Sequence, residues 1–518
     1  MNNWVESKVS GLKRFKITMA VDQSSYRQII RATSVLGGIQ VFNIIISIIR
    51  SKFIAVLLGP AGMGIAGLLV TTTGLIEIIT GFGLSTSAVR NISVASAQND
   101  SLKLRTTVTI FRKLVWFTGL LGTIVTIIFA PLLSELTFGN RNYTLAFSVI
   151  SITLLLSQLS TGQLVILQGT RNLKYLAKAD MVGFLIGLFI SVPLYYKFGT
   201  DGIIPAILAS SSLALLSSWF FSSKVKIPKV TVSKSHFRFE SKSMLKMGFL
   251  LSLSGLITAI SSYALKIFIG KNGGVEQVGF YNAGFAIINT YVGIIFTAMV
   301  KDYYPRLSEV SSDNRATVNL INIQSEIAIL IIAPILMMFI TFINWAVILL
   351  YSVKFSAIIG MLRWAALGMF FKTVCWTLSF VFMAKGSARI FFLNELIFNI
   401  YLLILNIIGY KLYGLTGLGI SFLIGYIVFF LHIFIQSRLL YTFTFNKDFI
   451  KFFIIQFLIG LISFFTIEKV GKPFSYLLTS TFILLSCIYS FIELNKRLNI
   501  SQFLLAFFNK IRKRNALQ

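Results

Sequence analysis

A small set of charged side chains lies inside stretches of the sequence that are otherwise apolar. The cations are Arg50, Lys52, Lys266, Arg363 and Lys372, and the acid nearest the middle of such a stretch is Glu77. A charge near the centre of a membrane costs about 2.5–3.5 kcal/mol on insertion scales, so each one requires a role. Because Arg and Lys bind phosphate through charge-assisted hydrogen bonds, the excess of cations suits a cleft that accepts a phosphate group.

The spacing of these cations limits how many of them can face one cleft. Arg50 and Lys52 are two residues apart, which is about 200° around a helix, so they point to opposite faces. Arg363 and Lys372 are nine residues apart and diverge by the same geometry. One of Arg50 and Lys52 is therefore expected to pair with Glu77 or to extend to the membrane interface.

Roles follow from this geometry. Asn43 lies seven residues before Arg50, on the same helix face, and can line the same cleft. Glu77 is the predicted counter-charge, or the carboxylate that couples transport to a proton or another cation. The residues predicted to contact the substrate are Lys52, Lys372, Lys266, Arg50, Arg363 and Asn43.

The composition places these residues in a membrane protein. Of 518 residues, 56% are hydrophobic and 12% are charged, yet the formal net charge is +30. Soluble domains are about 45–50% apolar and about 25% charged, so a soluble nucleic-acid-binding protein is excluded, and the apolar fraction also excludes disorder. Basic cytoplasmic loops between membrane helices account for both numbers.

Fourteen apolar stretches are long enough to cross the membrane, for which roughly 20 residues are needed. Continuous runs of this length predict helices, whereas a β-barrel would show alternating segments of about 10 residues. The predicted spans are 32–58, 62–86, 113–134, 143–168, 178–196, 202–222, 246–270, 278–300, 320–350, 356–384, 390–410, 414–436, 449–467 and 474–494.

The distribution of Lys and Arg orients these spans. With the N-terminus inside, most of the 47 Lys and Arg residues fall in alternate connections, which predicts an N-in, C-in topology with an even number of helices. The basic loop from Lys224 to Lys246 is expected to orient helices and to contact anionic lipid headgroups. No aromatic stacking pattern accompanies it, so no nucleic-acid partner is expected.

Internal similarity predicts the architecture. Glycines recur at matching helix ends, and we call the separation of Gly64 from Gly279 in the sequence the repeat offset. Gly199 and Gly202 precede Gly414 and Gly417 by the same offset, and Gly169 precedes Gly386 by nearly the same one. Because this offset contains six helices, an even number, the halves are expected to be parallel and related by a pseudo-two-fold axis along the membrane normal.

The predicted fold is therefore an all-α polytopic membrane protein with two six-helix bundles and an additional C-terminal helix pair. Its parts are a cytoplasmic N-terminal segment (1–31), the first bundle (32–222), a basic cytoplasmic linker (223–245), the second bundle (246–436), the extra helix pair (437–494) and a basic cytoplasmic tail (495–518).

Three motifs carry a family resemblance. Residues 51–62 read Ser-Lys-Phe-Ile-Ala-Val-Leu-Leu-Gly-Pro-Ala-Gly, residues 349–357 read Leu-Leu-Tyr-Ser-Val-Lys-Phe-Ser-Ala, and residues 304–308 read Tyr-Pro-Arg-Leu-Ser. They resemble motifs of the O-antigen-type polysaccharide flippases, nearest to the lipid III branch. That family belongs to the multidrug/oligosaccharidyl-lipid/polysaccharide exporter superfamily. The resemblance extends over residues 30–436.

The resemblance implies a function. Such proteins move an undecaprenyl-diphosphate-linked oligosaccharide from the cytoplasmic to the periplasmic leaflet of the bacterial inner membrane by alternating access. Expected partners are this glycan lipid, membrane lipids, a coupling cation (H⁺ or Na⁺), and glycan polymerase and chain-length proteins. Some members carry an acid three residues before the lysine of the tenth helix, where this chain has Met369. The additional helix pair resembles that of lipid II flippases, where it helps to form a groove for the lipid tail.

Two other functions remain open from the sequence. A cation-coupled multidrug antiporter of the same superfamily would transport cationic substrates, for which a cleft rich in cations is poorly suited. A glycan-lipid polymerase would need a large extracytoplasmic loop, whereas the outer loops here are short. The sequence contains no phosphate-binding loop that ends in Lys-Ser/Thr and no clustered metal ligands, so neither an enzyme nor a cofactor is predicted.

Overall fold

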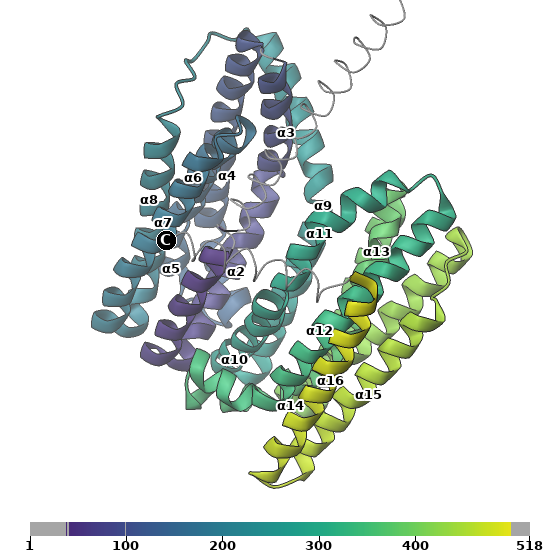
Figure 1. Cartoon of the computed structure of the whole chain (residues 1–518). Helices are drawn as coiled ribbons and strands as arrows, with labels where there is room; N and C mark the ends of the chain where they lie inside the picture. Colours follow the sequence, from purple (N-terminus) through teal and green to yellow (C-terminus); the bar gives the residue numbers. More distant parts are fainter. Residues whose placement is uncertain (1–37, 39–40, 99, 499–518) are drawn as a thin grey trace, which may run out of the picture. The chain divides into compact units, whose positions relative to one another are not determined.

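The protein is helical throughout the part that the structure describes. The computed structural model describes residues 38, 41–98 and 100–498, and every regular element in these ranges is a helix (Figure 1). In these ranges ten segments are long and apolar enough to span a membrane. This confirms the predicted all-α polytopic class. The expected N-terminal segment 1–31 and the tail beyond residue 498 lie outside the described residues.

The chain divides into two compact units, and we describe each by itself. The described residues of the first unit lie within Met1–Arg50, Ile76–Leu133 and Asn142–Leu253. Its helices are α3 (Leu84–Ala97), α5 (Thr144–Ile150), α6 (Ile152–Gly169), α7 (Leu173–Phe198), the 3₁₀ turn η1 (Gly199–Gly202) and α8 (Ile203–Ser222), together with most of α4 (Ser101–Phe138).

The second unit comprises Ser51–Leu75, Ser134–Arg141 and the described part of Ser254–Gln518. It contains the first part of α2 (Gly59–Gly81) and the second half of α9 (Lys234–Gly273). The other helices are α10 (Val275–Ala286), the π-helix η2 (Ile287–Val292), α11 (Ile294–Glu309), α12 (Asn314–Leu350), the 3₁₀ helix η3 (Val353–Ile358), α13 (Ile359–Ala384), α14 (Ala388–Tyr441), α15 (Lys447–Lys469) and α16 (Phe474–Leu498).

Several helix limits differ from the predicted ones, and two of them concern the ends of the first bundle. Residues 41–57 are helical and contribute to both units, with Arg50 in the first and Ser51 in the second. The basic linker predicted at 223–245 becomes helical at Lys234, because α9 extends the seventh predicted span toward its N-terminus.

Two long segments each contain two predicted spans. The segment 173–222 turns at Gly199 (φ 57°, ψ −133°) and the segment 388–441 turns at Gly414 (φ 57°, ψ −136°). Positive φ favours glycine because it has no Cβ. After these turns Gly202 packs on the carbonyl oxygen of Leu194, and Gly417 packs on that of Gly409. Both turns and both contacts recur at the repeat offset, as the glycine pattern predicts.

The third glycine match requires a correction. The left-handed residue that ends α6 is Arg171 (φ 57°), and the one that ends α13 is Gly386 (φ 73°). The following residues make equivalent backbone bonds, from the Asn172 N–H to the Leu167 carbonyl and from the Ser387 N–H to the Phe382 carbonyl, both 2.8 Å. These positions are separated by the repeat offset itself. The match of Gly169 to Gly386 was therefore wrong by two residues, because Arg171 adopts the conformation that glycine was expected to mark.

Within the second unit, α2 and α10 cross in a reciprocal way. A Cβ atom added to Gly64 would lie 2.0 Å from the Val275 carbonyl oxygen, and one added to Gly279 would lie 1.9 Å from that of Pro60. Val275 follows Pro60 by the repeat offset, as Gly279 follows Gly64. The repeat offset therefore converts the approach of Gly64 to Val275 into the approach of Gly279 to Pro60. This exchange is what the predicted pseudo-two-fold relation would produce.

The last two helices pack mainly on α12 of the second unit, and α15 also packs on α13. Both α15 and α16 lie beside α12 (Figure 1). Between them the buried Gln456 amide donates to Ser490 Oγ at 2.8 Å and accepts from Ser486 Oγ at 2.6 Å. Because the polar groups of Gln456 are satisfied inside this helix pair, the pair is held together by its own hydrogen bonds.

Candidate functional site

Asn43 and Arg50 lie on one face of the helix at 41–57, as their spacing predicted, and that face packs on α7 and α8. The Asn43 amide donates to Asp180 Oδ2 at 2.6 Å. The Arg50 guanidinium donates to Ser191 Oγ at 3.5 Å and to Ser210 Oγ at 3.4 Å. The first unit therefore contains a polar cluster with one cation and one carboxylate inside its helices.

Glu77 belongs to the same unit but has a different neighbour. Its Oε1 accepts a hydrogen bond from Ser157 Oγ on α6 at 2.8 Å. Within the described residues Glu77 forms no salt bridge, so the hypothesised pairing with Arg50 or Lys52 is not observed. The reason is that Arg50 is directed toward α7 and α8, and Lys52 toward the end of α12.

Lys52 has different partners from Arg50, as their positions on opposite helix faces predicted. Its ammonium donates to the backbone carbonyl of Leu349, in the last turn of α12, within the second unit. The final carbonyls of a helix lack intrahelical partners and carry partial negative charge, so a cation there is stabilised. Lys52 thus satisfies the end of α12 in this structure.

Lys266 lies on α9 and contacts α2. Its Nζ donates to Thr71 Oγ1 at 2.6 Å, and that hydroxyl donates in turn to the carbonyl of Gly67 at 2.6 Å. Both partners are neutral. The charge of Lys266 therefore has no carboxylate among its hydrogen-bond partners.

Lys372 lies on α13 and has a similar neutral environment. Its Nζ donates to Asn289 Oδ1 at 2.9 Å. The same ammonium lies over the rings of Phe422 and Tyr426, 5.7 and 5.6 Å from the ring centres, at cation–π distance. Asn289 is part of the π-helix η2, and π-helical turns are frequent at functional sites.

Two asparagines, on α10 and η2, add to the polar side chains around these two lysines. The amide of Asn282 lies against Gly67, one helical turn from Thr71, and its Nδ2 is buried without a hydrogen-bond partner. Asn289 follows Asn282 by seven residues, two turns along α10 and η2. We call this set the polar row: Lys266, Thr71, Asn282, Asn289 and Lys372.

Arg363 faces away from the polar row. Its guanidinium interacts electrostatically with Glu468 on α15 and with Tyr476, near the start of α16. Its Nε is buried without a hydrogen-bond partner. Arg363 and Lys372 therefore point in different directions, as predicted from their spacing, and Arg363 is directed toward the extra helix pair.

Sequence reasoning missed several polar residues in these clusters, including Ser191 and Ser210 beside Arg50. Three others are Asp180, Asn282 and Asn289, which hydrogen-bond or contact Asn43, Gly67 and Lys372. Asp180, Asn282 and Asn289 each lie in an apolar helix. A search for Asp and Asn inside apolar stretches, like the search for Lys and Arg, would have found them.

The sequence matches the model of a known protein family. The model of a family described as "Polysaccharide biosynthesis protein" matches residues 53–360, more than half of the chain. The chain belongs to this family. The match includes Lys266, Asn282 and Asn289 of the polar row, and it ends before Arg363 and Lys372.

Two relatives of this chain are named as lipid III flippases. The chain is 20% identical over 380 residues to the lipid III flippases of Escherichia coli (strain K12) and Shigella flexneri, covering 73% of this chain and 91% of each relative. These names agree with the expectation that the chain is not an enzyme.

Solved structures support the fold. The lipid II flippase MurJ in an inward closed conformation has a TM-score of 0.65 at 17% identity, covering 90% of this chain and 99% of that one. An inward-facing multidrug resistance MATE family transporter of the MOP superfamily has a TM-score of 0.63 at 17% identity, covering 78% and 94%. The chain therefore shares the fold of these solved structures.

Proposed function

We propose that the protein is a flippase for a lipid-linked glycan, which it moves from the cytoplasmic to the periplasmic leaflet of the inner membrane. The expected substrate is an undecaprenyl-diphosphate-linked oligosaccharide, an O-antigen or related repeat unit. Support comes from the family, and from relatives that are named as lipid III and lipid II flippases.

The observation that carries this proposal is the neutral environment of the two lysines in the polar row. Lys266 bonds to a hydroxyl and Lys372 to an amide, inside membrane-spanning helices. Ammonium groups without a counter-charge in such a place are costly, and the bound anion of a substrate would compensate them. A diphosphate offers several acceptor oxygens, and the free Nδ2 of Asn282 adds a neutral donor.

The other predicted contacts remain part of the proposal. Lys52 and Arg50 can exchange their present partners, a carbonyl and two hydroxyls, for phosphate oxygens, because these bonds are weaker than an ion pair. Arg363 and Asn43 are also proposed to contact the substrate. Glu77 is the proposed coupling carboxylate for H⁺ or Na⁺. Glycan polymerase and chain-length proteins are proposed as partners that receive the exported glycan.

Alternating access is the proposed mechanism. The ends of α2 and α10 that begin at Gly59 and Val275 lie on the periplasmic side by the predicted topology. There the two helices contact through backbone atoms at Gly64 and Gly279. Release of the substrate outward requires this crossing to open, because it closes the space between α2 and α10.

The deciding experiment measures where the glycan lipid accumulates. In a strain lacking the protein, unpolymerised lipid-linked glycan should build up in the cytoplasmic leaflet, protected from an external lectin in spheroplasts. The wild-type chain should restore exposure, and Lys266→Ala with Lys372→Ala should not. Lys411→Ala, which removes a cation over the ring of Phe268, is the matched control and should restore exposure.

Other results would point elsewhere. Accumulation of exposed but unpolymerised glycan in the deletion strain would indicate a polymerase. Transport of a cationic dye by the purified protein in liposomes, without movement of a glycan lipid, would indicate a multidrug antiporter. Either result would overturn the flippase proposal.

A further inference from the structure

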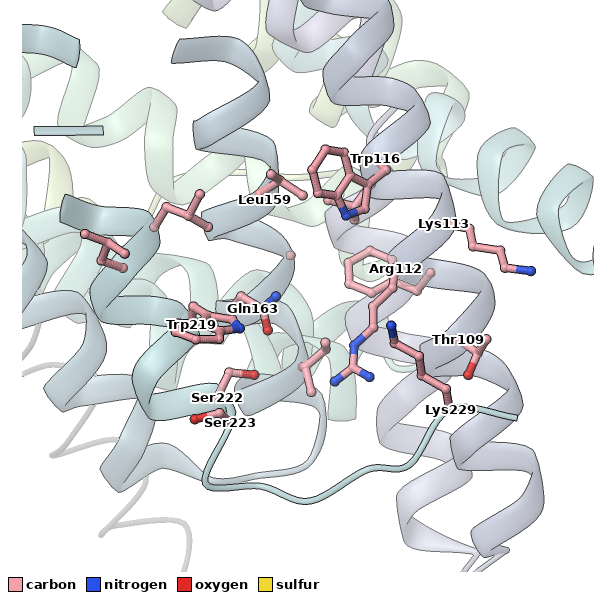
Figure 2. A pocket seen from close by; sticks show the side chains of 16 residues that line it. Thr109, Arg112, Lys113, Trp116, Leu159, Gln163, Trp219, Ser222, Ser223 and Lys229 are labelled. Carbon is pink, nitrogen blue, oxygen red and sulfur yellow. The ribbon is translucent and has the colours of Figure 1, made fainter. Parts of the chain in front are cut away.

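The first unit contains a pocket that the proposed transport route does not use. It has a volume of about 600 Å³ and lies between α4, α6, α8 and the loop that follows α8 (Figure 2). Charged, aromatic and hydroxyl side chains line it, among them Arg112, Trp116, Gln163, Trp219, Ser222 and Lys229. The arrangement of these groups indicates which ligand the pocket can take.

Three cations border the pocket, Arg112, Lys113 and Lys229, and two of them point into it. Figure 2 shows the Arg112 guanidinium and the Lys229 ammonium directed into the space below Trp116, whereas the side chain of Lys113 extends away from it. Lys113 lies over the ring of Phe237, 5.5 Å from its centre. Arg112 makes one long bond, 3.4 Å, to the carbonyl of Ile227. No Asp or Glu occurs among the described residues that line the pocket, so the two charges lack a counter-ion there.

A buried donor also lacks a partner. Ser222 is 2% exposed, and its Oγ has no hydrogen-bond partner. Figure 2 shows this hydroxyl on the pocket wall, near the amide of Gln163. An unpaired buried hydroxyl costs about 1–3 kcal/mol, and a ligand oxygen in the pocket would satisfy it.

The remaining wall is apolar and open to the surroundings. Trp116 is 51% exposed and Trp219 is 60% exposed. Exposed Trp side chains on membrane helices lie at the headgroup level, where one part of the ring is apolar and the N–H is hydrated. The pocket therefore combines a surface for a lipid chain with a site for an anion.

The pocket lies near the cytoplasmic surface by the predicted topology. Ser222 is the last residue of α8, and the basic loop begins immediately after it. The backbone N–H of Val230 in that loop lies 3.4 Å from Thr109 Oγ1 on α4, so Lys229 is held beside the helix. Positively charged loops mark the cytoplasmic leaflet, where phosphate groups of lipids are found at this depth.

We propose that this pocket binds the phosphate of a lipid in the cytoplasmic leaflet. Arg112 and Lys229 bind the phosphate oxygens, Ser222 and Gln163 donate hydrogen bonds to it, and the lipid chain lies along Trp116 and Trp219. Two lipids present this chemistry, an anionic phospholipid and an undecaprenyl diphosphate. The second source would make the pocket a capture site for the substrate and rests on the proposed function, whereas the first does not.

The test is native mass spectrometry of the full-length protein in detergent. It is titrated separately with phosphatidylglycerol, with undecaprenyl diphosphate and with phosphatidylcholine. We expect the wild-type chain to retain at least one of the two anionic lipids, and Arg112→Gln with Lys229→Gln to weaken that binding by about tenfold or more. Ser222→Ala should weaken it less. Lys113→Gln is the matched control, since its ammonium lies outside the pocket, and it should bind as the wild type does.

The outcomes separate the sources. Selective loss of phosphatidylglycerol binding in the double variant identifies a structural lipid site, and selective loss of undecaprenyl diphosphate binding identifies a capture site. Equal binding of phosphatidylcholine and both anionic lipids to the wild type would overturn the proposal, as would equal effects of the double variant and Lys113→Gln. Mass spectrometry measures lipid binding without transport. A negative result would therefore overturn the lipid-binding proposal and would not affect the flippase proposal, which is tested by lectin labelling.

Discussion

The amide of Asn282 on α10 occupies the space that a side chain at position 67 on α2 would need. A Cβ atom added to Gly67 would lie 1.9 Å from Asn282 Nδ2. The two positions are separated by the repeat offset, so the positions that the repeat makes equivalent contact each other. A pseudo-two-fold relation between the halves would place such a self-contact at its axis. The close approaches of Gly64 to Val275 and of Gly279 to Pro60 lie nearer the N-terminal ends of the same two helices.

This contact provides a test of alternating access. Cysteines at both positions, Gly67→Cys with Asn282→Cys, should form a disulfide on mild oxidation, because the two side chains share one space. The cross-link should stop glycan export, and a reductant should restore it. Export is measured by lectin labelling of intact cells, and the single cysteine variants control for the native Cys375 and Cys487. Undiminished export in fully cross-linked protein would show that this crossing does not open.

Substitution of Lys372 should separate binding from stability. Lys372→Ala is expected to abolish surface glycan while the protein remains in the membrane, because among the described residues the ammonium bonds to Asn289 and lies over two rings, without an ion pair. Export is measured by surface labelling and stability by thermal unfolding in detergent. A variant that exports normally would remove Lys372 from the diphosphate site.

Lys52→Ala should also abolish export and, in contrast to Lys372→Ala, should lower stability. The reason is its bond to the Leu349 carbonyl at the end of α12, where a cation contributes about 0.3–1 kcal/mol. The same two measurements apply. Lower stability with unchanged export would leave Lys52 with a role at the helix end only.

Glu77→Gln should remove the dependence of export on the proton or sodium gradient, because an amide cannot release a proton and binds cations weakly. Ser157→Ala keeps the carboxylate and removes only its hydrogen bond, so it should retain that dependence. The measurement is glycan-lipid flipping in liposomes with and without an imposed gradient. If Glu77→Gln still responds to the gradient, Asp180, bonded to Asn43, is the carboxylate to test next by Asp180→Asn.

A charged network holds the inner end of the last helix. Arg497 pairs with Glu326 at 2.8 Å, with Glu493 at 2.9 Å and with Asp448 at 3.2 Å. The Glu326 side chain is only 6% exposed, and the guanidinium lies 4.6 Å from the ring centre of Phe452. Three helices, α12, α15 and α16, are therefore joined at one guanidinium.

Removal of this junction should destabilise the protein. Arg497→Met leaves Glu326 without its ion partner, and we expect a loss of about 1–3 kcal/mol, measured as a lower midpoint of thermal unfolding. Glu135→Gln is the matched control, because its ion pair with Arg141 is exposed and such pairs contribute about 0–1 kcal/mol. Equal midpoints for Arg497→Met and the wild type would show that the network contributes nothing measurable.

The helices themselves could be predicted from the sequence. The apolar stretches from 62–86 to 474–494 are largely helical in the structure, although some of them, such as 62–86, 143–168 and 278–300, are divided between two or more helices. They could be found from the sequence because the hydrophobic length needed to cross a membrane is a local property of the chain. The turns at Gly199 and Gly414 could also be located from the sequence, because glycine readily adopts their backbone angles. The turn at Arg171 was misaligned by two residues because no glycine marks it.

The partners of the intramembrane charges required the tertiary structure. The sequence by itself determined that Arg50 and Lys52 diverge, and that Asn43 and Arg50 share a face, because both follow from helical periodicity. Only the tertiary structure decided that Lys52 meets the end of α12, that Arg363 faces α15 and α16, and that Glu77 meets Ser157. The physical reason is that these contacts depend on which helices pack together, often between segments far apart in the chain, and apolar helix surfaces carry little information about their neighbours.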